Sequence, residues 1–169
     1  MAPQPGIAIG LAVTPQDMED ARKLFLEYAA WLKFDLCFQG FDAELAGLPG
    51  KYAPPQGRLL LARAGDEAAG CIALRPLAPG IGEVKRLYVR PAYRGRGIAT
   101  RLAQELLAAA RAIGYASLRL DTLAFMHEAA ALYRSLGFVG IAPYYDNPLP
   151  DVRYMELSLR LSPHVAPAS

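Results

Sequence analysis

The sequence predicts one mixed α/β domain in which helices cover the faces of a central sheet. The chain of 169 residues is long enough for a single domain with a buried core, and its composition, 53% hydrophobic and 20% charged, is globular. Two adjacent strand patterns lie early in the chain and a strand–helix–strand pattern lies later, an order that implies a mixed sheet. We expect one domain over residues 1–169, with a tail that frays from about residue 162.

The N-terminal third predicts a strand, a long helix and an extended connection. Residues 7–13 predict the strand, and Thr14 suits the N-cap of a helix over 15–32 that begins with proline. Apolar side chains recur at helical spacing along that helix, at Met18, Ala21, Phe25, Tyr28 and Leu32. Residues 33–57 form a long connection rich in aromatic residues, Gly and Pro, with a short helix expected around 42–46.

The middle of the chain predicts three further strands. Residues 58–64 and 68–75 are joined by the sequence GDEA, which is typical of a hairpin turn. The sequence PLAPGIG then turns the chain into a strand over residues 83–89.

The C-terminal half predicts two helices and the last strands. Residues 97–113 and 125–136 each carry an apolar stripe at helical spacing and end before a glycine. Strand patterns follow at 116–121, 138–142 and 152–159. The complete prediction contains about seven strands and about four helices.

Composition and charge exclude several classes of function. The net charge is +2, so the chain lacks the broad basic field of nucleic-acid-binding proteins. We see no signal peptide and no apolar run long enough to cross a bilayer, and therefore expect a cytoplasmic protein without a membrane partner. Cys37 and Cys71 lack metal-ligand spacing, so we expect reduced thiols and no metal site.

The stretch VRPAYRGRGIATRL, residues 89–102, places two glycines and two arginines at the start of a predicted helix. A helix begins with backbone N–H groups that lack a partner within the helix, and its dipole adds positive potential there. Gly95 and Gly97 let the backbone approach a ligand, and Arg94 and Arg96 supply charge that pairs with phosphate oxygens. These features predict a phosphate site, although the chain has no P-loop and only an incomplete dinucleotide fingerprint.

The sequence RGRGIA at residues 94–99 resembles the [R/Q]-x-x-G-x-[G/A] signature of the GNAT superfamily of N-acetyltransferases. The preceding EVKRLYV at 83–89 resembles that family's fourth strand, and AAALYRSLGFVGI at 129–141 resembles a later helix and its end. The resemblance implies a mostly antiparallel sheet with a splay between the fourth and fifth strands, and acetyl transfer from acetyl-CoA without a metal. Taken alone, the first motif also fits a glycine turn with solvated arginines.

The resemblance assigns cofactor-binding roles to the backbone of two segments. Amides that would bind the pyrophosphate of acetyl-CoA belong to Arg94, Gly95, Arg96, Gly97, Ile98 and Ala99, with Thr100 at the margin. The backbone of Leu87, Tyr88 and Val89 would pair with the pantetheine arm. An N–H group near Leu87 or Tyr88 would polarise the thioester carbonyl, which is oxyanion-type stabilisation.

The resemblance also places Tyr133 near the coenzyme sulfur, where its hydroxyl would protonate the leaving thiolate. The alternative is that Tyr133 belongs only to the apolar face of its helix. Met126 stands where many members of the family carry an asparagine, so an amide contact to the cofactor is lost or supplied differently. His127 is a candidate substitute, or a solvated histidine at the start of the helix.

Glu83 is the candidate general base, because several family members carry a glutamate at the start of the fourth strand. Strand alternation predicts Glu83 and Lys85 on one face of the sheet and Arg86 on the other. The alternative role for Glu83 is an ion pair with Lys85 or another nearby cation. Asp121 and Asp146 are weaker candidates for the base.

The acceptor site is expected in the long connection and in a late loop. The candidates are Phe34, Asp35, Phe38, Gln39, Phe41, Tyr144, Tyr145, Asp146 and Asn147. Aromatic rings with a carboxylate suit a small molecule whose primary amine attacks acetyl-CoA directly in a ternary complex, but such rings also close a core. The competing functions are a peptide or protein N-acetyltransferase, a non-catalytic acyl-CoA sensor and a scaffold, and a homodimer stays open.

Overall fold

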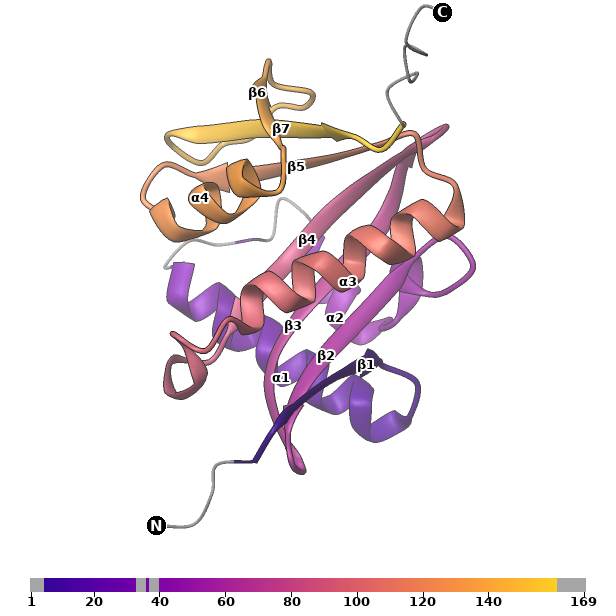
Figure 1. Cartoon of the computed structure of the whole chain (residues 1–169), viewed down its shortest axis with the longest axis vertical. Helices are drawn as coiled ribbons and strands as arrows, with labels where there is room; N and C mark the ends of the chain where they lie inside the picture. The colour runs from indigo at the N-terminus through magenta and orange to yellow at the C-terminus, as the bar shows by residue number, and fades with distance from the viewer. Residues whose placement is uncertain (1–4, 33–35, 37–39, 161–169) are drawn as a thin grey trace, which may run out of the picture.

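A seven-stranded sheet forms the centre of the computed structural model, which describes residues 5–32, 36 and 40–160. The strands lie in the order β1-β2-β3-β4-β5-β7-β6 (Figure 1). In chain order they are β1 (Ile7–Leu11), β2 (Arg58–Ala64), β3 (Glu67–Ala78), β4 (Ile81–Val89), β5 (Ser117–Leu123), β6 (Val139–Ile141) and β7 (Val152–Ser158). The helices are α1 (Pro15–Leu32), α2 (Phe41–Ala46), α3 (Ile98–Ile113) and α4 (His127–Ser135), with 3₁₀ turns η2 (Gly50–Tyr52) and η3 (Pro91–Tyr93).

The order of elements is the one that the sequence predicts, and the differences are confined to boundaries. The first helix has the predicted bounds. The hairpin of β3 and β4 is longer than expected, because β3 extends to Ala78 and β4 begins at Ile81. The expected frayed tail lies outside the described residues. None of the described helices combines the length and the apolar character needed to cross a membrane.

A reciprocal cap fixes the start of α1. Thr14 Oγ1 accepts a hydrogen bond from the Asp17 N–H at 3.0 Å, and Asp17 Oδ2 accepts from the N–H groups of Thr14 (3.0 Å) and Val13 (2.8 Å). Arg63 of β2 donates to Asp17 Oδ1 at 2.6 Å, which ties the helix to the sheet. The backbone hydrogen bonds from Thr14 and Val13 are the main reason that the pKa of Asp17 falls to about 2.

We expect Asp17→Asn to lower the free energy of unfolding by about 1 kcal/mol at neutral pH, because it weakens this cap. A carboxylate with a lowered pKa stabilises the fold above the pKa of the unfolded chain, and that contribution disappears as pH falls toward the folded-state pKa of about 2. Urea unfolding at about pH 6 and about pH 2.5 should therefore show the gap between variant and wild type shrinking with acid. Asp66→Asn, in the exposed turn between β2 and β3, is the control, and a gap independent of pH would contradict the expectation.

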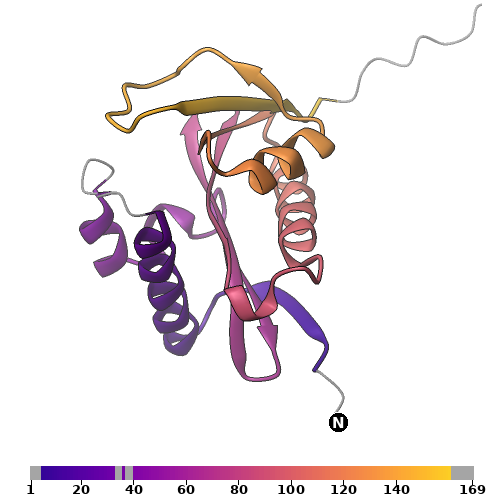
Figure 2. The same cartoon turned by 90° about the vertical axis from the view of Figure 1, so that its left-hand side faces the viewer.

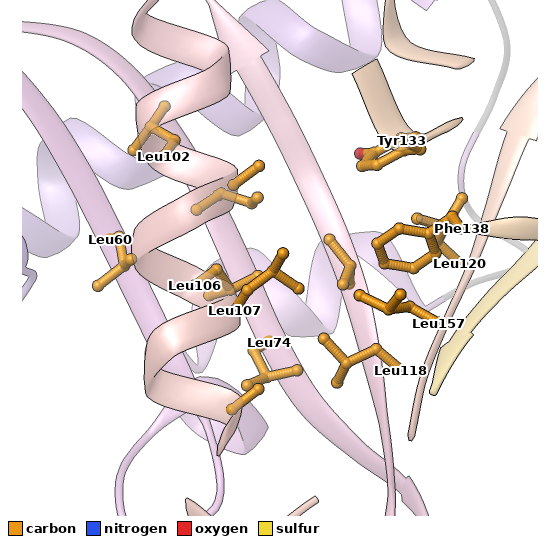
Figure 3. Close-up of a cluster of buried hydrophobic side chains, with 14 of the residues drawn as sticks. Leu60, Leu74, Leu102, Leu106, Leu107, Leu118, Leu120, Tyr133, Phe138 and Leu157 are labelled. Carbon is orange, nitrogen blue, oxygen red and sulfur yellow. The ribbon is translucent and has the colours of Figure 1, made fainter. Parts of the chain in front are cut away.

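The helices cover the two faces of the sheet separately, with α1 and α2 on one face and α3 and α4 on the other (Figure 2). Each face has its own buried core. The core under α3 and α4, shown in Figure 3, includes Leu60, Leu74, Leu102, Leu106, Leu107, Leu118, Leu120, Tyr133, Phe138 and Leu157. The core under α1 includes Ala21, Leu24, Phe25, Leu59, Leu61, Cys71 and Ala73. This division places the polar side chains of β4 at the α1 face, next to the splay described below.

The sheet is antiparallel except between β4 and β5, which are parallel and pair only briefly. Residues 81–83 of β4 pair with 117–119 of β5. Both strands continue beyond this point, to Val89 and Leu123, without further pairing to each other. The two strands therefore splay apart, as the family resemblance implies, and no strand among the described residues pairs with this edge of β4 between Lys85 and Val89, which we call the open edge of β4.

A β-bulge in β4 corrects the expected placement of Arg86. Lys85 pairs opposite Ala73 and Tyr88 opposite Cys71, so two residues of β4 oppose Ile72 alone. Arg86 has φ of 61°, in the left-handed region. Strict alternation therefore fails here, because the bulge places Arg86 on the α1 face together with Lys85. Its guanidinium contacts α2 there, with Nε 2.9 Å from a carboxylate oxygen of Glu44.

Candidate active site

A cleft of about 590 Å³ opens along the splay, between β4 on one side and the start of α4 on the other. Nearly all residues predicted to bind the cofactor line it. These are Leu87, Tyr88, Val89, Arg94, Gly95, Gly97, Ile98, Ala99 and Thr100. The remaining predicted residue, Arg96, does not line the cleft. The open edge of β4 and the start of α3 thus border one continuous space.

The start of α3 presents unpaired backbone amides at one end of the cleft. Gly97 is the N-cap with φ of 74°, and Gly95 has φ of 77°. Residues with a Cβ atom rarely adopt this conformation, which accounts for both glycines. The first helical hydrogen bond runs from the Arg101 N–H to the Gly97 carbonyl at 3.1 Å, and no described side chain caps the helix. The amides of 98–100 are therefore available to an anion.

The arginine side chains of the motif bind protein groups. Arg94 Nε donates to the Val89 carbonyl at 2.9 Å, and its guanidinium lies 5.5 Å from the centroid of the Trp31 ring. The Arg96 guanidinium donates to the Pro5 carbonyl at 3.3 Å and lies over the Tyr93 ring. These contacts hold the loop in shape, and Arg94 also contributes to the wall of the cleft.

A smaller cavity of about 40 Å³ lies next to the cleft, and the two share Leu87, Met126 and Ala129 in their walls. Tyr133 lines this inner cavity, is 7% exposed and packs its ring on Phe138 at 5.5 Å between centroids (Figure 3). Within the described part of the chain, no hydrogen bond engages the Tyr133 hydroxyl. Burial raises the pKa of Tyr133, so its phenol keeps the proton at neutral pH.

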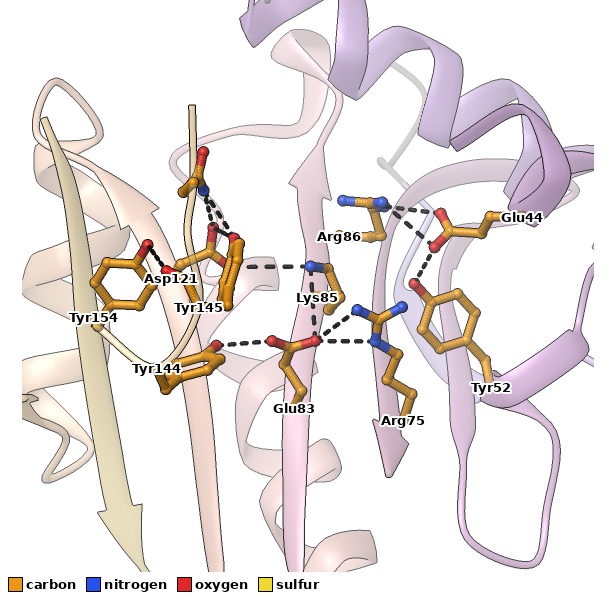
Figure 4. A network of polar contacts seen from close by, with 11 residues as sticks. Glu44, Tyr52, Arg75, Glu83, Lys85, Arg86, Asp121, Tyr144, Tyr145 and Tyr154 are labelled. Carbon is orange, nitrogen blue, oxygen red and sulfur yellow. Dashed lines mark hydrogen bonds and ion pairs between the residues drawn. The ribbon is translucent and has the colours of Figure 1, made fainter. Parts of the chain in front are cut away.

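A network of charged side chains crosses β3, β4 and β5 beside the inner cavity (Figure 4). Glu83 is its centre and is almost completely buried. Arg75 Nε donates to Glu83 Oε1 at 2.9 Å, and Arg75 Nη2 forms an ion pair with the same oxygen at 2.9 Å. The Tyr144 hydroxyl donates to Oε2 at 2.7 Å. Lys85 Nζ lies 3.7 Å from Oε1. Both oxygens of Glu83 therefore already have donors.

Asp121 occupies the β5 side of the same network. The Tyr145 hydroxyl donates to Asp121 Oδ2 at 2.7 Å, and Asn147 Nδ2 donates to the same oxygen at 3.3 Å. Lys85 Nζ lies 4.0 Å from Asp121 Oδ1, so this lysine stands between two carboxylates. Burial raises the pKa of both Tyr144 and Tyr145, which keeps their hydroxyls protonated as donors.

The surroundings of Glu83 and Lys85 move their pKa values in the same direction. Burial acts to raise the pKa of Glu83, but the charges of Lys85 and Arg75 and the hydrogen bond from Tyr144 outweigh it and hold the pKa below its usual value. Burial lowers the pKa of Lys85, against the opposing charges of Glu83 and Asp121. Glu83 is thus an ionised, ion-paired carboxylate at neutral pH.

Comparison with known proteins identifies the family. The model of the Acetyltransferase (GNAT) family matches residues 16–138 of the 169 in the chain. The chain belongs to the GNAT family. It is an acyltransferase that depends on acetyl-CoA, as the sequence predicts.

Two relatives and one solved structure illustrate the likeness. The chain is 44% identical over 157 residues to an uncharacterised N-acetyltransferase of Schizosaccharomyces pombe, a match that covers 90% of this chain and 95% of the relative. It is 40% identical over 99 residues to the N-alpha-acetyltransferase RimI of Mycobacterium tuberculosis, covering 55% of this chain and 60% of RimI. The fold is similar to that of yncA from Salmonella typhimurium, solved with its cofactor acetyl-CoA, with a TM-score of 0.70, 19% identity and coverage of 96% and 98%.

Met126 lines both the cleft and the inner cavity. Its Sδ accepts a weak hydrogen bond from the Thr122 hydroxyl at 3.6 Å. His127 is the first residue of α4, is exposed and lines the cleft. The position therefore contributes an apolar surface, with a histidine beside it at the cleft wall.

The residues predicted for the acceptor site do not form one group in the structure. Phe34, Asp35, Phe38 and Gln39 lie outside the described residues, as does Cys37. Phe41 is buried in the core under α1, where the Arg86 guanidinium lies 5.2 Å from its ring centroid. Tyr144, Tyr145 and Asn147 hold the carboxylates of the network, whereas Asp146 is exposed outside it.

Sequence reasoning missed several residues of this site. Arg75 and Lys85 were not candidates for the site itself, and Trp31 and Phe125 contact each other at 5.9 Å between ring centroids in the cleft wall. Arg75 and Lys85 lie on strands, Trp31 lies near the end of α1, and Phe125 lies in the loop before α4. None of these positions gives a periodic signal in the sequence.

Among the described residues, no three His, Cys, Asp or Glu side chains gather as metal ligands, and Cys71 is a buried free thiol.

Proposed function

We propose that this GNAT protein transfers the acetyl group of acetyl-CoA to a primary amine of a small molecule, by direct attack of the amine in a ternary complex. The observation that carries the proposal is that the cleft adjoins the inner cavity. The cleft extends from the start of α3 along the edge of β4 that β5 leaves unpaired, and it shares wall residues with the cavity that Tyr133 lines. A pyrophosphate, an extended pantetheine arm and a thioester need these three environments in this order.

The proposed cofactor contacts use backbone groups. The amides of Gly95 and of 97–99, with Thr100 at the margin, would bind the pyrophosphate, helped by the positive end of the α3 dipole. The two arginine amides of the motif are less suited, because the Arg94 N–H already donates to the Pro91 carbonyl at 3.3 Å and Arg96 does not line the cleft. The backbone of Leu87, Tyr88 and Val89 would pair with the amide groups of pantetheine, because β5 leaves this edge of β4 unpaired. An N–H group near Leu87 or Tyr88 would then polarise the thioester carbonyl.

Tyr133 is the proposed general acid. The amine nitrogen bonds to the carbonyl carbon, the carbon–sulfur bond breaks, and the sulfur leaves with the electron pair. The Tyr133 hydroxyl gives its proton to that thiolate, and the proton released by the amine restores the phenol. The raised pKa and the absence of a hydrogen-bond partner among the described residues support this role, since the proton is present and uncommitted.

Glu83 keeps the two roles that the sequence leaves open. As a general base it would receive the proton of the acceptor ammonium, directly or through water. Its contacts with Arg75, Lys85 and Tyr144 favour the ion-pairing role, in which it orients the other charges of the site. The cytoplasmic location and a homodimer stay predictions from the sequence.

We expect Glu83→Gln to separate these roles. If the carboxylate is the base, the variant loses about 10²-fold or more in kcat, and raising the pH restores rate because the amine then loses its proton without help. If Glu83 only orients its neighbours, the loss is smaller and the pH profile keeps its shape. Rates should be measured with acetyl-CoA and a saturating amine between about pH 6 and about pH 9, with Glu105→Gln on the exposed side of α3 as the control.

Thiol release from acetyl-CoA with a panel of small primary amines, amino acids and a short peptide tests the function itself. We expect release with at least one small amine. The likeness to RimI favours a second candidate, transfer to the N-terminal amine of a peptide, which release with the peptide alone would support. Binding of acetyl-CoA without thiol release in the presence of any amine would overturn both candidate functions and support a non-catalytic acyl-CoA sensor.

A further inference from the structure

Lys85 is a buried cation whose hydrogen-bonding capacity is not used by the described protein. Its side chain is 4% exposed and lines the inner cavity together with Tyr133. Its two ion-pair contacts, 3.7 Å to Glu83 and 4.0 Å to Asp121, are both longer than a hydrogen bond. Nothing else in the described ranges hydrogen-bonds its Nζ.

Among the described contacts, three of the four oxygens of the two carboxylates beside Lys85 are already engaged by other donors. Arg75 and Tyr144 donate to Glu83, and Tyr145 donates to Asp121 at 2.7 Å. The ammonium of an incoming acceptor would have to compete with these donors at Glu83 and at Asp121 Oδ2, and the remaining oxygen, Asp121 Oδ1, lies 4.0 Å from the Lys85 ammonium. An incoming anionic group has no such competitor, because the Lys85 ammonium can turn its N–H groups toward the cavity.

We propose that Lys85 binds a carboxylate of the acetyl acceptor, so that the acceptor is an amine with a carboxylate a few bonds away, as in an α-amino acid. This proposal rests on the proposed function of the same site. Lys85 is two residues from Leu87 on β4, and both line the inner cavity, so a carboxylate at Lys85 places a nearby amine at the thioester. The volume of about 40 Å³ admits a group as small as a carboxylate.

The rest of the cavity wall indicates the remainder of the acceptor. Apolar side chains from α1, from Leu36, from β5 and from the loop before β7 line it: Leu32, Leu36, Leu123 and Leu149. These surfaces suit an apolar side chain on the amino acid. A polyamine is disfavoured, because its extra ammonium groups would lie beside the positive charge of Lys85.

Matched pairs of acceptors test the proposal in the full-length wild-type protein. The pairs are alanine with ethylamine, leucine with 3-methylbutylamine and phenylalanine with 2-phenylethylamine, each read by thiol release from acetyl-CoA. We expect kcat/KM to be at least about tenfold higher for an amino acid than for the amine that lacks its carboxylate, and spermidine to be a poor acceptor. An equal or better rate with the decarboxylated amines would overturn the proposal while leaving the proposed function intact, whereas no release with any amine would overturn both.

Variants of Lys85 test whether this residue causes the preference for amino acids over the decarboxylated amines. Lys85→Met keeps a similar length without the charge and should bring the ratio of kcat/KM for the amino acid to kcat/KM for the decarboxylated amine close to one, mainly through a higher KM for the amino acid. Lys85→Arg should keep the preference, and Lys23→Met, on the exposed face of α1, is the control. An equal loss on both members of each pair, in a variant that still binds acetyl-CoA, would show that Lys85 is only a counter-ion for Glu83 and Asp121 and would overturn the proposal.

Discussion

Gly97→Glu is expected to abolish the binding of acetyl-CoA. The substitution places a negative charge at the start of α3, beside the amides proposed to bind pyrophosphate. A Cβ atom at Gly97 would meet no protein atom within 4 Å, so the new side chain would extend into the open cleft. The left-handed φ of 74° adds strain of about 1–2 kcal/mol for a residue with a side chain. Calorimetric titration should show a loss of affinity of about 100-fold or more.

Gly65→Glu is a closely matched control for this variant. Gly65 has φ of 62° and equally open surroundings, but it lies in the turn between β2 and β3, away from the cleft. It should share the backbone strain of Gly97→Glu and keep the affinity of the wild type for acetyl-CoA. Unchanged affinity in Gly97→Glu, or an equal loss in both variants, would reject the phosphate site at α3.

Tyr133→Phe is expected to lower kcat by about 10²-fold or more while leaving the affinity for acetyl-CoA within about twofold. The variant removes only the hydroxyl, and the ring keeps its packing on Phe138. Because no described residue hydrogen-bonds that hydroxyl, its loss strands no buried partner and should leave the fold intact. Thiol release measures the rate and calorimetry measures the affinity.

Tyr115→Phe serves as the control for Tyr133→Phe, since the Tyr115 hydroxyl donates to the Gln56 carbonyl outside the cleft. It should match the wild type in both measurements. Equal turnover of Tyr133→Phe and wild type would remove Tyr133 as the acid and leave it as one more side chain of the core under α3 and α4.

The elements of the fold were predictable because each has a local signal. Thr14 marks the start of α1, and the reciprocal hydrogen bonds with Asp17 confirm it. The stripe of Leu102, Leu106 and Ala110 predicts the buried side of α3, and all three lie in the core. Caps and periodic burial act over a few residues, so one sequence is enough to locate them.

The arrangement of the charged network was not predictable for the opposite reason. Tyr144 reaches Glu83 across 61 positions of the chain, and Tyr145 reaches Asp121 across 24. Such contacts depend on where a loop lies over the sheet, which no local pattern encodes. The bulge at Arg86 is a further case, because alternation assumes an unbroken strand and nothing in KRLYV signals the extra residue.

The splay between β4 and β5 could be predicted from the sequence, but its effect on the environment of Lys85 could not. The resemblance to the GNAT family implies it, and the end of pairing between β4 and β5 after Glu83 confirms it. The environment of Lys85 could not be predicted from the sequence, because only the structure shows that this cation in the middle of β4 lines a cavity together with Tyr133. Lys85, which the sequence predicts only as an ion-pair partner of Glu83, is therefore a candidate for binding the acceptor.

Calorimetric titration of the purified wild-type chain with acetyl-CoA, and in parallel with CoA, tests the central claim most directly. The claim is that the amides of α3 and the open edge of β4 form one binding site for the coenzyme. We expect one-site binding of both ligands with a Kd of about micromolar order, because both carry the pyrophosphate and the pantetheine arm. Absence of binding for both ligands would contradict the account and leave the GNAT fold of this chain without the function proposed for its cleft.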